Sequence, residues 1–124
     1  MEQQAMPDLH SRLLVPALAG LAGAAFICQA GSALAVDDDA ARKLAKQNNC
    51  FRCHAVEREK NGPAWADIGT KYKSKPDGEA RLLKHLTSAP KVRLREDDVE
   101  EEHKIVKFRK HEDLENLARW VLSL

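Results

Sequence analysis

The 124-residue chain has almost no surplus of charge of either sign. Lysine and arginine together number 20, aspartate and glutamate 19, and the formal net charge is +1. Proteins that coat nucleic acid need a cationic face, so this balance argues against a histone-like or other polyanion-binding role. A hydrophobic content of 44% also argues against a disordered polyelectrolyte. The chain fits one modest domain with at most a short appendage.

Cysteine is scarce. The three cysteines are Cys28, Cys50 and Cys53, too few and of the wrong parity for a small secreted fold held together by many disulfides. A disulfide between Cys50 and Cys53 would close a very short loop and add little stability. These two thiols therefore point to chemistry other than cross-linking.

The sequence also lacks an apolar run long enough to span a bilayer. The run Leu13–Ile27 falls short of the roughly 20 residues that a membrane helix needs. Arg12 precedes it and Ala33-Leu34-Ala35 follows it, which is the pattern of a secretory signal peptide. We therefore predict a signal peptide over residues 1–35, removed together with Cys28, and one domain over residues 36–124. A retained membrane anchor is the alternative.

Residues Cys50-Phe51-Arg52-Cys53-His54 form a C-x-x-C-H motif. At this spacing two thiols can add to the two vinyl groups of one haem while the adjacent imidazole reaches the iron. A thioredoxin-like redox pair needs a preceding strand, whereas a helix-forming segment precedes Cys50. A structural zinc site needs a second ligand pair, and the sequence contains none downstream. The motif thus predicts one covalent haem, attached through Cys50 and Cys53, with His54 as an iron ligand.

The hydrophobic periodicity predicts a mainly helical domain. Acidic residues 37–39 precede the first helix, as the helix dipole prefers. Leu114, Leu117, Trp120, Val121 and Leu124 recur at helical spacing near the end of the chain. We expect helices over 40–49, 64–72, 77–88 (capped by Asp77) and 114–124, and loops over 55–63 and, with short extended pieces, over 91–110.

Three segments together resemble the class I c-type cytochromes of bacteria, in particular the small ones with short loops. They are Asn48–His54, Asn61–Tyr72 and Leu117–Leu124, and the resemblance covers essentially all of residues 36–124. It implies an all-α class I cytochrome c fold, with about four helices wrapped around one covalently attached haem c.

The resemblance also implies roles for residues near the haem. The carbonyl of Pro63 would accept a hydrogen bond from the proximal imidazole of His54, and His85 would lie where relatives place a basic group at a haem propionate. Trp65, Tyr72 and Trp120 would pack against the haem or in the core, and one indole N–H would reach a propionate.

One feature departs from the family pattern, because residues 36–124 contain no methionine and most relatives use methionine as the sixth iron ligand. His103 lies seventeen residues before Trp120, about where that methionine falls, and we predict it as the distal ligand. His111, His85, a lysine or an open iron are the alternatives. Bis-histidine ligation implies a low-spin iron with a reduction potential below that of His/Met relatives.

The predicted function is a periplasmic monohaem carrier that transfers single electrons between redox proteins. A saturated iron leaves no position for a substrate, so we expect no enzymatic activity. The mature protein is expected to be a soluble monomer and not to bind nucleic acid. The lysines and arginines between Lys71 and Lys110 form either a docking ring for an acidic partner or an ordinary solvated surface. The alternatives are a haem-based gas or redox sensor with a displaceable distal histidine, and a dedicated electron-accepting subunit of a periplasmic dehydrogenase.

Overall fold

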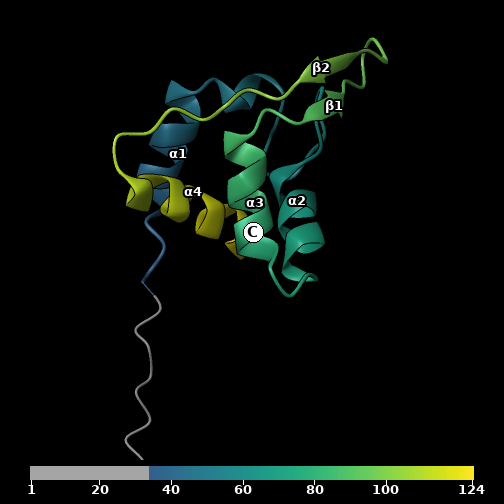
Figure 1. Cartoon of the computed structure of the whole chain (residues 1–124). Helices are drawn as coiled ribbons and strands as arrows, with labels where there is room; N and C mark the ends of the chain where they lie inside the picture. Colours follow the sequence, from purple (N-terminus) through teal and green to yellow (C-terminus); the bar gives the residue numbers. More distant parts are fainter. Residues whose placement is uncertain (1–33) are drawn as a thin grey trace, which may run out of the picture. The chain divides into compact units, whose positions relative to one another are not determined.

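A computed structural model describes residues 34–124 (Figure 1). The predicted signal peptide lies outside these residues, apart from Leu34 and Ala35, so the boundary after Ala35 stays a prediction. No helix among the described residues is both long enough and apolar enough to cross a membrane.

The predicted all-α fold with four helices is confirmed in this part of the chain. A short 3₁₀ turn, η1, follows the first helix, and one small two-stranded sheet lies before the last helix. The helices are α1 (Asp38–Gln47), α2 (Trp65–Lys73), α3 (Gly78–Thr87) and α4 (His111–Ser123), and η1 covers Cys50–Arg52.

The ends of α1 explain how the chain enters the C-x-x-C-H motif. The side chain of Asp37 accepts a hydrogen bond from the amide of Ala40 at 2.9 Å, which caps the helix N-terminus. The helix ends at Gln47 with Asn48 as its C-cap, and Asn49 takes a left-handed conformation with φ of 58°. Asparagine tolerates this conformation better than most residues, so the chain turns here directly into η1.

The start of α3 differs from the prediction in one respect. Asp77 occupies the N-cap position, but its side chain makes no capping hydrogen bond. Its carboxylate instead accepts a hydrogen bond from Nε of Arg81 at 2.7 Å. The Asp77 carboxylate therefore forms an i, i+4 ion pair with Arg81 instead of capping the N-terminus of α3 as we expected.

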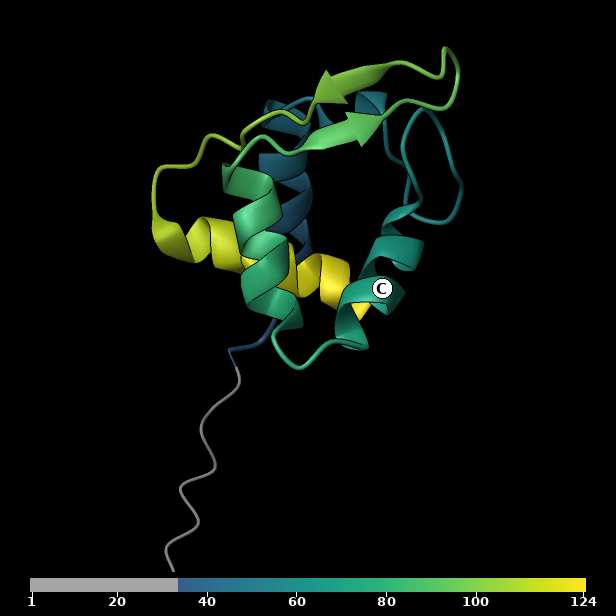
Figure 2. The same cartoon turned by 45° about the vertical axis from the view of Figure 1, so that its right-hand side comes forward.

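Helix α4 lies at the centre of the packing, because it contacts α1, α2 and α3 (Figure 2). Most of the apolar stripe predicted for it is buried, since Leu114, Leu117, Trp120 and Val121 are each no more than 5% exposed, while Leu124, the C-cap, is half-buried. Ala118 of α4 is buried as well, and the other buried members of the core come from the three remaining helices and one loop: Ala41, Leu44, Ala45, Trp65, Leu82 and Val106.

Helices α2 and α4 approach each other closely at Gly69. A Cβ at this position would lie 2.3 Å from the backbone oxygen of Val121, which is well inside van der Waals contact. The absence of a side chain at Gly69 therefore sets the distance between the two helices.

The segment that we expected to be a loop with extended pieces forms a β-hairpin. Strands β1 (Lys91–Arg93) and β2 (Glu100–Glu102) are antiparallel, with Lys91 opposite Glu102 and Arg93 opposite Glu100. Opposite charges on directly facing residues favour this pairing. The sequence pattern does not indicate this hairpin. A half-buried strand alternates apolar with polar residues, whereas β1 and β2 consist almost entirely of charged residues.

We predict that Gly69→Ala destabilises the fold because the new Cβ would force α2 away from α4. Overpacking of this kind costs about 1–3 kcal/mol of unfolding free energy. Thermal and denaturant unfolding of the haem-loaded protein should show this loss, whereas Thr70→Ala, at the exposed neighbouring position of α2, should unfold almost like wild type. Equal stability of the two variants would contradict the close approach.

Candidate functional site

The two cysteines of the motif flank the 3₁₀ turn. Cys50 begins η1, and the backbone oxygen of Cys50 accepts hydrogen bonds from the amides of Cys53 at 3.2 Å and His54 at 3.0 Å. Because side chains three residues apart eclipse in a 3₁₀ turn, the two thiols lie on one face. Both thiols are free and half-buried, and burial raises the pKa of Cys50. They are thus placed to attach to one flat group lying over this face.

His54 follows the turn and is held by the next loop. Its Nδ1 lies 2.7 Å from the carbonyl oxygen of Pro63. A carbonyl can only accept, so Nδ1 carries the proton and Nε2 keeps the lone pair that a metal requires. Burial lowers the pKa of His54, which favours the neutral imidazole. The Pro63 contact that the resemblance implies is therefore present in the geometry.

Gly62 and Trp65 fix the orientation of the His54 ring. A Cβ on Gly62 would lie 2.7 Å from Cε1 of His54, so only a glycine lets the chain pass this close to the imidazole. The indole of Trp65 stacks on the His54 ring, with ring centroids 6.0 Å apart and an angle of 18° between the planes. Trp65 in turn meets Trp120 edge to face at 4.8 Å, which joins the His54 ring to the core.

His103 follows β2 directly and brings a second imidazole close to His54. Its Nδ1 lies 2.9 Å from the carbonyl oxygen of Lys104. By the same argument as for His54, Nδ1 is the donor and Nε2 is left with its lone pair. Burial lowers the pKa of this half-buried ring as well, so that it is neutral near pH 7.

The spacing of His54 and His103 fits an iron atom between them. Their ring centroids are 6.2 Å apart. Two metal–nitrogen bonds of about 2.0 Å account for roughly two thirds of this distance. The remainder is close to twice the distance from a ring nitrogen to the centre of an imidazole. The side chains present at this point of the fold are therefore compatible with a haem iron held by two imidazoles.

His85 of α3 lies beside His103. The two ring centroids are 4.6 Å apart with 63° between the planes. Burial, with smaller electrostatic contributions from His103, His54 and Lys71, lowers the pKa of His85 to about 4. The ring is therefore neutral at pH 7 and packs edge to face against the predicted distal ligand.

His111 and the indole of Trp120 are engaged elsewhere. His111 is the first residue of α4, is exposed, and has its Nε2 3.4 Å from the Glu115 carboxylate. The Trp120 indole donates a hydrogen bond to the carboxylate of Asp38, so this N–H is already paired with a residue in the first turn of α1.

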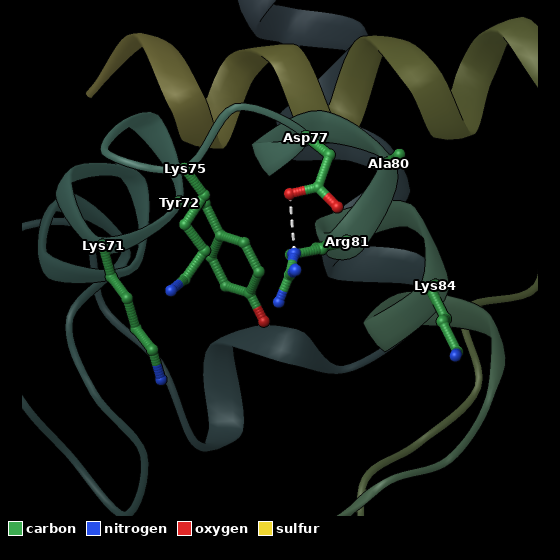
Figure 3. A pocket seen from close by; sticks show the side chains of 7 residues that line it. All are labelled: Lys71, Tyr72, Lys75, Asp77, Ala80, Arg81 and Lys84. Carbon is green, nitrogen blue, oxygen red and sulfur yellow. Dashed lines mark hydrogen bonds and ion pairs between the residues drawn. The ribbon is translucent and has the colours of Figure 1, made fainter.

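A shallow pocket opens between α2 and α3, and Figure 3 shows it from close by. Its rim is mainly cationic, and Asp77, the carboxylate on it, is paired with Arg81. None of the predicted haem ligands lines this pocket; it is lined by Lys71, Tyr72, Lys75, Asp77, Ala80, Arg81 and Lys84.

The sequence did not predict a role for two asparagines near the site. Asn48 bonds through its side chain to both backbone groups of Lys107, at 2.7 Å and 3.0 Å. Asn61 accepts hydrogen bonds from the amides of Arg95 and Glu96 through its side-chain oxygen. The only sequence signal is that asparagine commonly bonds to backbone groups in turns, and this does not identify partners more than thirty residues away.

Comparisons with known proteins agree with this architecture. The family model "Cytochrome c" matches residues 39–124. The chain is 36% identical over 66 residues to cytochrome c-552 of Hydrogenobacter thermophilus, a match that covers 53% of this chain and 54% of that protein. It is 51% identical over 39 residues to cytochrome c-552 of Nitrosomonas europaea, covering 32% and 38%. The chain thus spans about half or less of the length of these two curated relatives.

Solved structures match over nearly their whole length. The class 1 cytochrome MtoD of Sideroxydans lithotrophicus ES-1 is 48% identical, with a TM-score of 0.67, and the match covers 72% of this chain and 97% of that one. Wild-type cytochrome c552 of Nitrosomonas europaea is 31% identical, with a TM-score of 0.53, covering 67% and 98%.

The helical fold around a C-x-x-C-H turn and the family match over residues 39–124 lead to one conclusion: the chain belongs to the cytochrome c family, as a class I c-type cytochrome that carries one covalently attached haem c.

Proposed function

We propose that residues 36–124 form a periplasmic carrier that transfers single electrons between redox proteins, with His54 and His103 as the two axial ligands of the haem iron. The observation that carries this proposal is the 6.2 Å separation of the two imidazoles, each with its Nδ1 bonded to a backbone carbonyl. The periplasmic location rests on the predicted signal peptide.

The haem supplies the one-electron Fe(III)/Fe(II) chemistry, and the protein supplies its attachment and surroundings. Cys50 and Cys53 hold the group through two thioethers. The Pro63 carbonyl fixes the His54 ring and makes its Nε2 a better donor. Gly62 and Trp65 keep that ring in one orientation, so that electron transfer needs little movement of the protein.

The ligand set and the nearby charges favour a low reduction potential. Imidazole nitrogen donates more strongly than thioether sulfur and so stabilises ferric iron relative to His/Met ligation. The glutamates of β2, Glu100–Glu102, immediately precede His103 and are exposed. Their negative charge favours the ferric state in the same direction, although solvent and salt screen it.

Two histidines on the iron leave no coordination position for a substrate, which supports a carrier rather than an enzyme. A gas sensor requires that the distal ligand leave readily, and a dehydrogenase subunit requires a permanent partner. Rapid binding of carbon monoxide by the ferrous protein would favour the sensor, and copurification with an oxidoreductase would favour the subunit.

We propose that the protein works as a soluble monomer that meets its redox partners transiently. The cations of α2 and α3 have fewer carboxylates near them than the cations of the hairpin. On the hairpin, Lys91 faces Glu102 and Arg93 faces Glu100. Arg93 also binds Asp98 at 3.0 Å. Steering of an acidic partner therefore falls to the cations outside the hairpin.

We predict that the haem-loaded wild type is low-spin in both oxidation states and lacks the near-infrared sulfur-to-iron band. His103→Ala should turn the ferric iron high-spin because it removes the distal nitrogen, and absorption and electron paramagnetic resonance spectra would measure this. His85→Ala and His111→Ala are the matched controls and should stay low-spin. A low-spin His103→Ala protein would place the sixth ligand elsewhere, and a high-spin wild type would indicate an open iron.

We also predict that His103→Met raises the reduction potential. Thioether sulfur stabilises ferrous iron, so the midpoint in protein-film voltammetry should shift upward by on the order of 100 mV. The near-infrared band should appear in the same variant. An unchanged midpoint together with an unchanged spectrum would show that residue 103 does not bind the iron.

A further inference from the structure

The position of His103 is set by the hairpin that precedes it. The amide of His103 donates to the carbonyl oxygen of Pro90 at 2.8 Å, which extends the β1–β2 ladder by one rung beyond the pair Lys91 and Glu102. Any opening of the hairpin therefore moves the backbone that carries the predicted distal ligand.

Apolar packing does little to hold this part of the chain. Between residues 91 and 110, Val106 alone is buried, at 2% exposed. Its amide donates to Leu86 at 2.8 Å. The residues on either side of His103, Glu102 and Lys104, are exposed. Hydrogen bonds to other segments must therefore provide much of the restraint on His103.

One such restraint ties the far end of the hairpin to the loop after His54. The side-chain oxygen of Asn61 accepts hydrogen bonds from the amides of Arg95 at 3.0 Å and Glu96 at 3.1 Å. The guanidinium of Arg95 also pairs with the carboxylate of Glu59, and Glu59 forms an isolated antiparallel bridge with His54. Figure 2 shows the hairpin reaching over toward this loop. The hairpin is thus linked to the segment of the proximal histidine.

A second restraint lies on the other side of His103. Oδ1 of Asn48 accepts from the amide of Lys107 at 2.7 Å, and its Nδ2 donates to the Lys107 carbonyl at 3.0 Å. Nδ2 also donates to the carbonyl of Leu44 at 2.9 Å. Asn48 lies two residues before Cys50, so this contact fastens the segment after His103 to the attachment turn.

We propose that Asn61 and Asn48 are positioning residues that clamp the His103 segment from both sides and thereby slow the departure of the distal imidazole from the iron. This inference rests on the proposed ligation by His103. Through the clamp, the same loops that hold His54 and Cys50 also hold His103 on the iron. An iron that keeps its distal ligand is what distinguishes a carrier from a gas-binding protein.

The test is the rate at which carbon monoxide binds the ferrous, haem-loaded protein, measured by stopped flow. Carbon monoxide binds six-coordinate iron only after the distal ligand leaves, so this rate reports the departure of His103. Asn61→Ala removes the side-chain oxygen that both amides use, which leaves the Glu96 amide without this acceptor and the Arg95 amide with only the backbone oxygen of residue 61, at 3.1 Å. We expect binding about tenfold faster than wild type. Asn48→Ala should act in the same direction.

Two control variants separate positioning from general loosening. Asn61→Asp keeps the accepting oxygen and should bind carbon monoxide at close to the wild-type rate. Asn116→Ala removes a comparable pair of backbone contacts, from Asn116 to Asp37 at 2.9 Å and 2.8 Å, between α4 and the start of α1. It should lower the thermal midpoint much as Asn61→Ala does but leave the carbon monoxide rate unchanged.

A wild-type rate in both Asn61→Ala and Asn48→Ala would overturn the clamp, as would equal acceleration in Asn61→Ala and Asn116→Ala. Failure of the underlying ligation looks different, because it appears in the parent protein as a high-spin spectrum or as a His103→Ala variant that stays low-spin. A low-spin parent with unresponsive asparagine variants would remove the clamp and leave the proposed function in place.

Discussion

The hydrogen bond from Nδ1 of His54 to the carbonyl of Pro63 is the constraint around which the rest of the site is arranged. It requires the chain to fold back closely enough that Gly62 passes against the imidazole, where no Cβ fits. It leaves Nε2 of His54 directed away from the loop and available to a metal. Stacking on Trp65 then connects this ring to Trp120, so that the helical core and the proximal ligand are one packed unit.

The distal side is built on a different physical principle. The proximal ring rests on buried aromatic and helical packing, whereas His103 lies on an exposed, highly charged hairpin. Cross-strand charge pairs and hydrogen bonds from Asn48 and Asn61 take the place of an apolar core there. Hydrogen bonds and exposed ion pairs are individually modest in free energy, and the hairpin uses several of them together to keep one imidazole opposite His54.

Much of the fold could be predicted because its signals are local. The C-x-x-C-H turn, the acidic start of α1 and the apolar stripe of α4 are each contained within one helix or turn, and the structure has all three, although α1 and α4 begin at Asp38 and His111, earlier than we expected. The hairpin was missed because its register depends on partners far along the chain. Asp77 occupies the N-cap position that we expected, but its carboxylate pairs with Arg81 instead of capping the helix, and the sequence pattern does not show which of these two partners it takes.

The sequence by itself determined the haem family, the attachment turn and the helical class, because covalent chemistry and helical periodicity are written in short, contiguous patterns. It also nominated His103 by position and left His85, His111, a lysine and an open iron as alternatives. His111 pairs with Glu115 one turn further along α4, which is a local contact. Only the tertiary structure decided that His103 meets both His54 and His85. The reason is that these contacts join segments that are distant in the sequence, and the packing of α4 against the other helices and the clamped hairpin bring them together.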